Sequence, residues 1–160
     1  MDQPRRDAAE RSFRQFCETY HADLYSREWS ADHLKAIDRI EQAVLTGGQF
    51  AFAMPRGSGK TTLCISACIW SLLYAHRSFV VLIGAEATAA HELLDNLRTD
   101  LENNELLLKD FPEVVYPIRK LEGISHRCNG QTSQGERTQM TWTSDRVILP
   151  TIKGSKVSGA

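Results

Sequence analysis

Residues 53–62, with the sequence Ala-Met-Pro-Arg-Gly-Ser-Gly-Lys-Thr-Thr, have the types and spacing best suited to chemistry in this chain. Gly57 and Gly59 allow the backbone to curl around a ligand, because glycine has no Cβ to clash with it. The N–H groups of such a loop, together with the positive end of a helix that follows it, attract an anion. The pattern therefore predicts a site for the phosphates of a nucleotide.

Two side chains of this stretch receive specific roles from the pattern. Lys60 is expected to reach the β- and γ-phosphates, and the hydroxyl of Thr61 is expected to bind Mg²⁺. One departure is present, since Met54 stands where the pattern G-x-x-x-x-G-K-[ST] has its first glycine. The alternative is an ordinary glycine-rich turn, but an apolar run before the loop and a helical pattern after it favour phosphate binding.

Hydrolysis of a nucleotide needs a further carboxylate at the end of a second apolar strand, where it organises Mg²⁺ and the attacking water. The second apolar run, residues 79–83, is followed by Gly84 rather than by an aspartate. Glu86 fits the start of the next helix, and Asp145 fits a hairpin turn. The sequence therefore predicts only half of an ATPase site.

Apolar periodicity predicts the elements that position the loop. A lead-in helix is expected over 5–24, and Ser30 predicts the start of a second helix that ends at Gly47 and Gly48. The next elements are expected in this order: a strand over 49–54, the glycine-rich loop over 55–59, a buried helix over 60–76, a strand over 78–84 and a helix over 87–103. An exposed loop is then expected over 123–135, followed by a hairpin in which 138–143 and 146–151 are joined at Ser144 and Asp145.

The order of these elements predicts an α/β fold. Two apolar strands joined through a helix need a crossover, so residues 49–54 and 79–83 are expected to pair in one parallel sheet covered by the helix over 60–76. The expected architecture is a three-layer P-loop NTPase-type sheet with an N-terminal helical lead-in and a C-terminal hairpin. Residues 1–28 form the lead-in, and residues 29–160 form the N-terminal part of a P-loop ATPase domain.

Composition narrows the class of protein. A chain of 160 residues, 42% hydrophobic and 24% charged, has the balance of one globular domain rather than of a disordered or fibrous protein. The apolar run over 63–75 is too short to cross a bilayer, and the N-terminus lacks the apolar core of a secretory signal, so a cytoplasmic location is expected. Residues 86–113 are acidic and residues 119–160 mildly basic, which alone is weak support for a nucleic-acid surface.

The cysteines and isolated aromatic residues receive structural interpretations. Cys17, Cys64, Cys68 and Cys128 are expected to be reduced thiols that pack as small apolar groups, because no neighbouring His or Cys completes a metal site around Cys64 and Cys68. Trp29 and His33 precede the loop-bearing region. They either line a pocket for an adenine base or pack the lead-in against that region.

Residues 55–62, with Arg56 inside the loop and no leading glycine, resemble the variant phosphate loop of the large terminase subunits of tailed bacteriophages. Trp29-Ser30-Ala31-Asp32-His33 looks like the family's lead-in to its ATPase core. Similarity continues through residues 80–84, Leu101-Glu102-Asn103-Asn104 and Thr141-Trp142-Thr143, so the resemblance covers about 23–160.

This resemblance implies an ATP-driven motor that moves double-stranded viral DNA into a capsid. The residues implied in binding Mg²⁺-ATP are Pro55, Arg56, Gly57, Ser58, Gly59, Lys60, Thr61 and Thr62. Lys60 and Arg56 are implied in catalysis, with Arg56 sensing the γ-phosphate or coupling neighbouring subunits. The implied partners are DNA, a portal protein, the small terminase subunit and further copies of the chain.

In that family the acid-bearing strand and a nuclease domain follow the segment matched by residues 153–160. The resemblance therefore implies that residues 1–160 are an N-terminal piece that is inactive alone. Two alternatives remain open. A small-molecule P-loop kinase would share the loop but needs a lid with several arginines, whereas residues 123–137 contain only Arg127 and Arg137. A vestigial nucleotide-binding module without hydrolysis fits the loop by itself.

Overall fold

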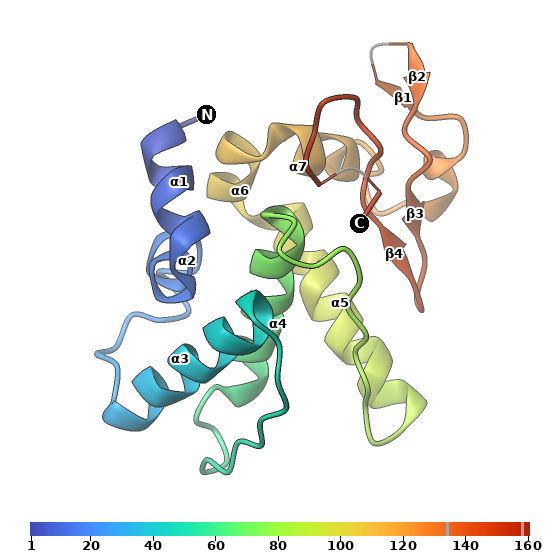
Figure 1. Cartoon of the computed structure of the whole chain (residues 1–160). Coiled ribbons are helices and arrows are strands. Elements are labelled where there is room, and N and C mark those ends of the chain that lie inside the picture. The colour runs from blue at the N-terminus through green and yellow to red at the C-terminus, as the bar shows by residue number, and fades with distance from the viewer. Residues whose placement is uncertain (134, 158) are drawn as a thin grey trace.

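A computed structural model describes residues 1–133, 135–157 and 159–160, and most of its regular structure is helical (Figure 1). The α-helices are α1 (Gln3–Arg11), α2 (Phe13–Tyr20), α3 (Ala31–Leu45), α4 (Lys60–Leu73), α5 (Ala87–Asn103), α6 (Glu105–Asp110) and α7 (Pro112–Arg119). The remaining elements are the 3₁₀ helix η1 (Ser125–Cys128) and four short strands, β1 (Thr132–Ser133), β2 (Glu136–Arg137), β3 (Thr141–Trp142) and β4 (Val147–Ile148).

The N-terminal segment is divided at Ser12, so the single helix expected over 5–24 is wrong. Ser12 has an extended backbone (φ −143°, ψ 121°), and its hydroxyl accepts the N–H of Gln15 to cap α2. The break lets α1 and α2 turn against each other and bury their apolar faces in one core. The buried side chains of the two helices are Ala9, Phe13, Phe16, Cys17 and Tyr20.

Helix α4 is the central element, and it contacts α2, α3 and α5. Its expected burial is confirmed, because only a few of its side chains reach solvent. Trp70 is fully buried, packs against Phe13 with ring centroids 5.4 Å apart, and donates its indole N–H to the carbonyl of Ala9 at 2.9 Å. The lead-in thus shares one hydrophobic core with the loop-bearing helix.

The expected parallel sheet is wrong. Within the described residues, the strands form only two antiparallel hairpins, β1–β2 and β3–β4, and neither 49–54 nor 79–83 belongs to a sheet. Figure 1 shows residues 46–59 as a loop beyond α3 and α4, and residues 78–86 as a separate extended segment beside α5. The chain is therefore a helical assembly with two small hairpins rather than a three-layer α/β sandwich.

The expected sheet does not form because the backbone of residues 79–83 has no neighbouring strand in the described part of the chain. Among the described residues, the N–H and C=O groups of 79–83 have no hydrogen-bond partner, although the segment is apolar and extended. A strand requires a second strand at the right distance and register, and an apolar run cannot supply its own partner. The apolar run over 79–83 therefore favours an extended backbone but does not determine whether that backbone pairs with another strand.

The second half of the chain agrees better with the sequence. Helix α5 has the expected bounds, and the Asn104 side chain that follows it accepts the N–H groups of Leu106 and Leu107 to begin α6. Thr141 lies opposite Ile148, which confirms the expected hairpin with shorter strands. Helices α6 and α7 were not expected, and β1 and β2 form a hairpin that begins in the expected exposed loop. In the described ranges, no helix has both the length and the apolar character needed to cross a membrane.

Candidate functional site

The glycine-rich loop leads directly into α4 in the conformation that its glycines permit. Gly57 and Gly59 have φ of 80° and 78°, in the left-handed region, and Gly59 is the N-cap residue of α4. No described side chain caps this end of the helix. No described side chain therefore occupies the first-turn N–H groups at Lys60, Thr61 and Thr62, which is a condition for binding an anion there.

The Lys60 side chain folds back over the loop. Its ammonium donates to the carbonyl oxygens of Met54 and Pro55, both at 2.8 Å. These two contacts tie the beginning of the loop to the first turn of α4 and hold a positive charge beside the loop. A phosphate approaching the loop would replace these carbonyls as the acceptors of the Lys60 protons.

Two further observations fit a phosphate in this loop. Cβ atoms built on Gly57 and Gly59 would meet nothing within 4 Å, so the space around both glycines is open to a ligand. The hydroxyl oxygen of Ser58 is buried and has no hydrogen-bond partner among the described residues. A buried hydroxyl without a partner is costly, and a ligand oxygen would satisfy it.

The other expected loop residues differ in exposure. Pro55 and Arg56 are exposed, and the Arg56 guanidinium has no hydrogen-bond or ion-pair partner in the described part of the chain. Thr61 is exposed and Thr62 half-buried. Because the expected site residues are contiguous, the structure brings all of them together at the start of α4 and leaves the roles of Arg56 and Thr61 as predictions.

Thr61 and Thr62 border a cavity of about 750 Å³ that also reaches α5 and the residues after α2. Asp23 and Asp100 line the same cavity, a relationship that the sequence analysis missed. Asp100 is already engaged, because His21 Nε2 lies 2.5 Å from one carboxylate oxygen and the Asn104 amide lies 3.2 Å from the other. These residues come from segments far apart in sequence, so no local spacing could have revealed the cluster.

The two acids considered for catalysis occupy the places expected of structural residues. Glu86 is the N-cap residue of α5, although its side chain makes no capping hydrogen bond. Asp145 lies in the turn between β3 and β4, where the hydroxyl of Thr143 donates to it at 2.8 Å and lowers the pKa of its carboxyl. Gly84 is required by close packing, because a Cβ there would lie 2.5 Å from the backbone nitrogen of Ala90. An aspartate cannot take this position without a shift of α5.

The structure separates the roles of Trp29 and His33. Trp29 packs on Tyr25 with ring centroids 4.8 Å apart and donates its indole N–H to Glu18 at 2.8 Å, which supports the packing alternative. His33 instead reaches the glycine-rich loop, where its Nε2 lies 2.8 Å from the carbonyl oxygen of Ser58. The contact joins residues 25 positions apart, and the sequence did not predict it.

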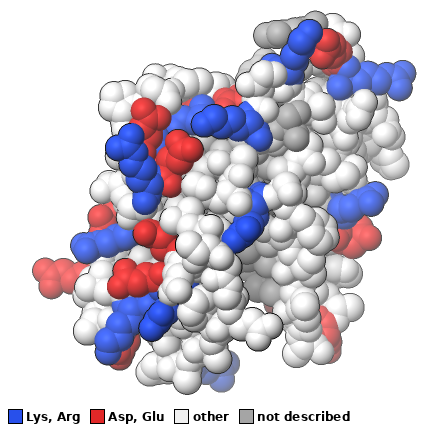
Figure 2. Space-filling view, in the orientation of Figure 1, with Lys and Arg blue, Asp and Glu red and all other residues white. Residues whose placement is uncertain are grey.

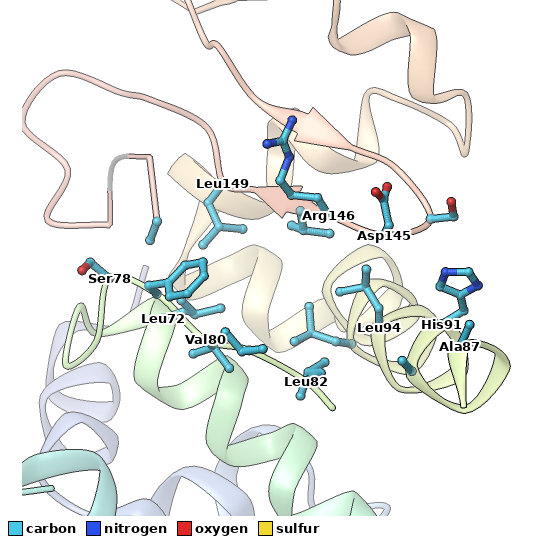
Figure 3. A pocket seen from close by; sticks show the side chains of 17 residues that line it. Leu72, Ser78, Val80, Leu82, Ala87, His91, Leu94, Asp145, Arg146 and Leu149 are labelled. Carbon is cyan, nitrogen blue, oxygen red and sulfur yellow. The ribbon is translucent and has the colours of Figure 1, made fainter. Parts of the chain in front are cut away.

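A second cavity, of about 550 Å³, separates the extended segment from the β3–β4 hairpin (Figure 3). Val80, Leu82 and Leu94 line one side, and Leu149 lies on the hairpin side with Asp145 and Arg146 at the rim. The lining is largely apolar and offers few groups that could bind an anion. We therefore take the glycine-rich loop, not this groove, as the candidate site.

The cysteines and the remaining metal-ligating side chains form no metal site within the described residues. The four cysteines are free thiols, of which Cys17 and Cys128 are buried, Cys68 is half-buried with a pKa raised to about 12 by burial, and Cys64 is exposed rather than packed. In the described ranges, no three His, Cys, Asp or Glu side chains are placed to hold a metal ion. Figure 2 shows basic and acidic side chains interspersed on the face drawn.

No protein-family model, curated protein or solved structure matches this chain.

Proposed function

We propose that residues 55–62 bind the phosphates of Mg²⁺-ATP. The observation that carries this proposal is the combination, in one short loop, of Gly57 and Gly59 at positive φ with the Lys60 ammonium held beside them. The unpartnered hydroxyl of Ser58 and the N–H groups in the uncapped first turn of α4 add further hydrogen-bond donors for phosphate oxygens. This arrangement is local, so phosphate binding does not depend on a parallel sheet.

Each residue has a defined task in this proposal. The first-turn N–H groups of α4 and the Ser58 hydroxyl donate to phosphate oxygens, and Lys60 exchanges its carbonyl acceptors for the β- and γ-phosphates. The exposed hydroxyl of Thr61 is available to a cation at the end of the helix. When bound, Mg²⁺ supplies charge neutralisation of the phosphates. In this proposal, the exposed Arg56 guanidinium contacts a terminal phosphate or a neighbouring subunit.

The resemblance of residues 55–62 to terminase large subunits supports a wider proposal. In it, the chain is the ATP-binding part of a viral DNA-packaging motor that works in the cytoplasm of a host cell. Double-stranded DNA, a portal protein, a small terminase subunit and further copies of the chain are its proposed partners. The support for this wider proposal is the loop sequence, with Arg56 inside the loop and Met54 in place of the leading glycine.

The second candidate function is nucleotide binding without hydrolysis. It is favoured by the engagement of Asp100 with His21 and Asn104, which leaves that carboxylate committed to the structure, and by the close packing at Gly84. Positioning and electrostatics are nearly the whole of phosphoryl-transfer catalysis, so a loop without a positioned base is expected to bind but not to turn over. Residues 1–160 are accordingly expected to release no phosphate above background, with or without DNA.

The proposed function is tested by comparing nucleotides that differ only in phosphate number. Calorimetric titration of the chain with ATP and with AMP, both with Mg²⁺, is expected to show clearly tighter binding of ATP, because Lys60 and the α4 N–H groups act on the β- and γ-phosphates. Equal affinity for the two nucleotides, or binding of neither, would contradict the proposal. Phosphate release is measured in parallel, and release above background would contradict the expectation that residues 1–160 bind ATP without hydrolysing it.

A further inference from the structure

Three groups connect the start of α3 to the phosphate loop. The Ser30 hydroxyl lies 2.7 Å from His33 Nδ1, and His33 Nε2 lies 2.8 Å from the carbonyl oxygen of Ser58. The same Ser30 oxygen accepts the backbone N–H of His33 at 3.3 Å as the N-cap of α3. The imidazole therefore spans the distance between a capped helix end and the middle of the loop.

The partners decide which nitrogen carries the proton in the neutral ring. A carbonyl oxygen can only accept, so the contact with Ser58 requires the proton on Nε2. Nδ1 then has a lone pair, and the Ser30 hydroxyl donates to it. Both ring nitrogens and the hydroxyl are thus satisfied by one consistent arrangement. The ring orientation is fixed from both ends.

We propose that His33 is a positioning residue that holds the peptide group between Ser58 and Gly59 in the orientation needed for phosphate binding. This inference rests on the proposed function of the loop. In a trans peptide, the C=O of one residue and the N–H of the next point in opposite directions. With the Ser58 carbonyl held toward His33, the N–H of Gly59 points away from α3, and a repelling carbonyl oxygen is kept from turning toward an anion.

Glycine makes this restraint necessary. Gly57 and Gly59 flank Ser58, both have positive φ, and neither has side-chain packing to limit rotation of the intervening peptide groups. The His33 contact is the one side-chain hydrogen bond to the Ser58 backbone within the described residues. Without it, the peptide group after Ser58 is free to rotate, and part of the population presents a carbonyl instead of an N–H to the phosphate.

The test uses the whole chain with three substitutions. His33→Leu removes the donor, His33→Gln supplies an amide N–H at the place of Nε2, and His91→Leu removes an exposed histidine on α5 as a matched control. Mg²⁺-ATP affinity is expected to fall roughly threefold to tenfold in His33→Leu, the range of one neutral hydrogen bond, and to recover in His33→Gln. The His91→Leu chain is expected to bind as the unaltered chain does.

A nucleotide-free measurement separates positioning from general loss of structure. Nitrogen NMR of the unaltered chain is expected to show the Nε2-protonated form of His33. The backbone amide signals of Ser58 and Gly59 are expected to broaden or split in His33→Leu, because the peptide group between them changes orientation, while the signals of α4 stay unchanged. Signals that change equally throughout α4, Ser58 and Gly59 signals that stay sharp and single, or a His33 ring protonated on Nδ1 alone, would overturn the inference.

The two proposals fail in different ways. If the unaltered chain binds Mg²⁺-ATP and Lys60→Ala loses that binding, but His33→Leu binds as tightly as the unaltered chain, the positioning role is wrong and the proposed function stands. If the unaltered chain does not bind Mg²⁺-ATP, the proposed function is wrong and this inference is overturned with it.

Discussion

The Arg5 guanidinium donates two hydrogen bonds to the Asp110 carboxylate, from Nε to Oδ2 at 2.7 Å and from one terminal nitrogen to Oδ1 at 2.8 Å. Asp110 is fully buried at the end of α6, and it also accepts the Tyr20 hydroxyl at 2.9 Å and the backbone N–H of Asp2 at 2.9 Å. One carboxylate therefore fastens the N-terminal helices to the second half of the chain.

Replacing this carboxylate is expected to destabilise the whole core. Asp110→Asn would place an amide against the Arg5 guanidinium and remove acceptor capacity from buried donors, at a cost of about 3 kcal/mol in the free energy of unfolding. Urea unfolding measures the change. The control is Asp32→Asn, because Asp32 is exposed and pairs only loosely with Lys35 at 3.6 Å, so a loss below about 1 kcal/mol is expected. Equal effects of the two substitutions would contradict the structure.

The same contact predicts how stability depends on pH. Burial alone would raise the pKa of Asp110, but the hydrogen bonds from Arg5, Asp2 and Tyr20 and the Arg5 charge outweigh it, and the pKa is lowered. A lowered pKa means that the folded state favours the ionised form. Its stabilisation is present above the unfolded pKa of about 3.9 and is lost as the pH falls through the folded value.

Unfolding measured from pH 6 to pH 3 checks this sign. The difference in free energy between the unaltered chain and Asp110→Asn is expected to shrink as the solution becomes acidic, because Asn does not titrate. A difference that stays constant, or that grows toward acid, would show that Asp110 does not contribute through its charge.

The sequence predicted those elements whose signals are local. Ser30 and the apolar spacing over 87–103 define a cap and a helix within a few turns, and both were confirmed. Residues 49–54 and 79–83 carry a strand signal, but a strand exists only with a partner, and the pairing depends on other parts of the chain. Helix α7 could not be predicted from the sequence, because the proline Pro117 in its interior disfavours a helix. Burial of its apolar side chains in the core nevertheless stabilises it.

In the candidate site, too, the sequence predicts the local features and not the contacts between distant segments. Residues 55–62 are contiguous, so their types and order were enough to place them together. The contacts of His33 with Ser58 and of His21 with Asp100 join distant segments, and neither pair has a spacing that a single sequence could reveal. The position of the glycine-rich loop at the start of a helix could be predicted from the sequence, and the side chains that contact this loop could not.

The extended segment predicts self-association. Phe79, Val81 and Ile83 are 79%, 61% and 84% exposed, and their backbone has no hydrogen-bond partner among the described residues. Exposed apolar residues on an unpaired extended backbone favour pairing between chains. Val81→Lys is expected to reduce light scattering in concentrated solution, because the new charges repel across a paired edge.

An isolated apolar side chain supplies the matched control for this prediction. Leu24 is 60% exposed but lies outside the extended segment, so Leu24→Lys is expected to leave the scattering nearly unchanged. Similar reductions from both substitutions would attribute the effect to net charge rather than to residues 79–83.

Glycine at position 57 is expected to matter for binding rather than for packing. A Cβ there meets nothing within 4 Å, but φ is 80°, so Gly57→Ala costs roughly 1 kcal/mol and favours a different loop conformation. Gly130 has the same φ and equally open surroundings, so Gly130→Ala is the matched control. Both substitutions are expected to lower stability alike in thermal unfolding, and only Gly57→Ala to weaken Mg²⁺-ATP binding. Equal binding by the two variants would argue against a phosphate in the loop.

The central claim is that Lys60 and its loop bind nucleotide phosphates, and calorimetric titration of Lys60→Ala with Mg²⁺-ATP tests it most directly. A charge-assisted contact contributes about 1.5–3 kcal/mol, so the affinity is expected to fall roughly tenfold to a hundredfold. Lys109→Ala removes an exposed lysine of α6 without a described partner and is expected to bind as the unaltered chain does. Equal Mg²⁺-ATP affinity of the Lys60→Ala and unaltered chains would contradict the account.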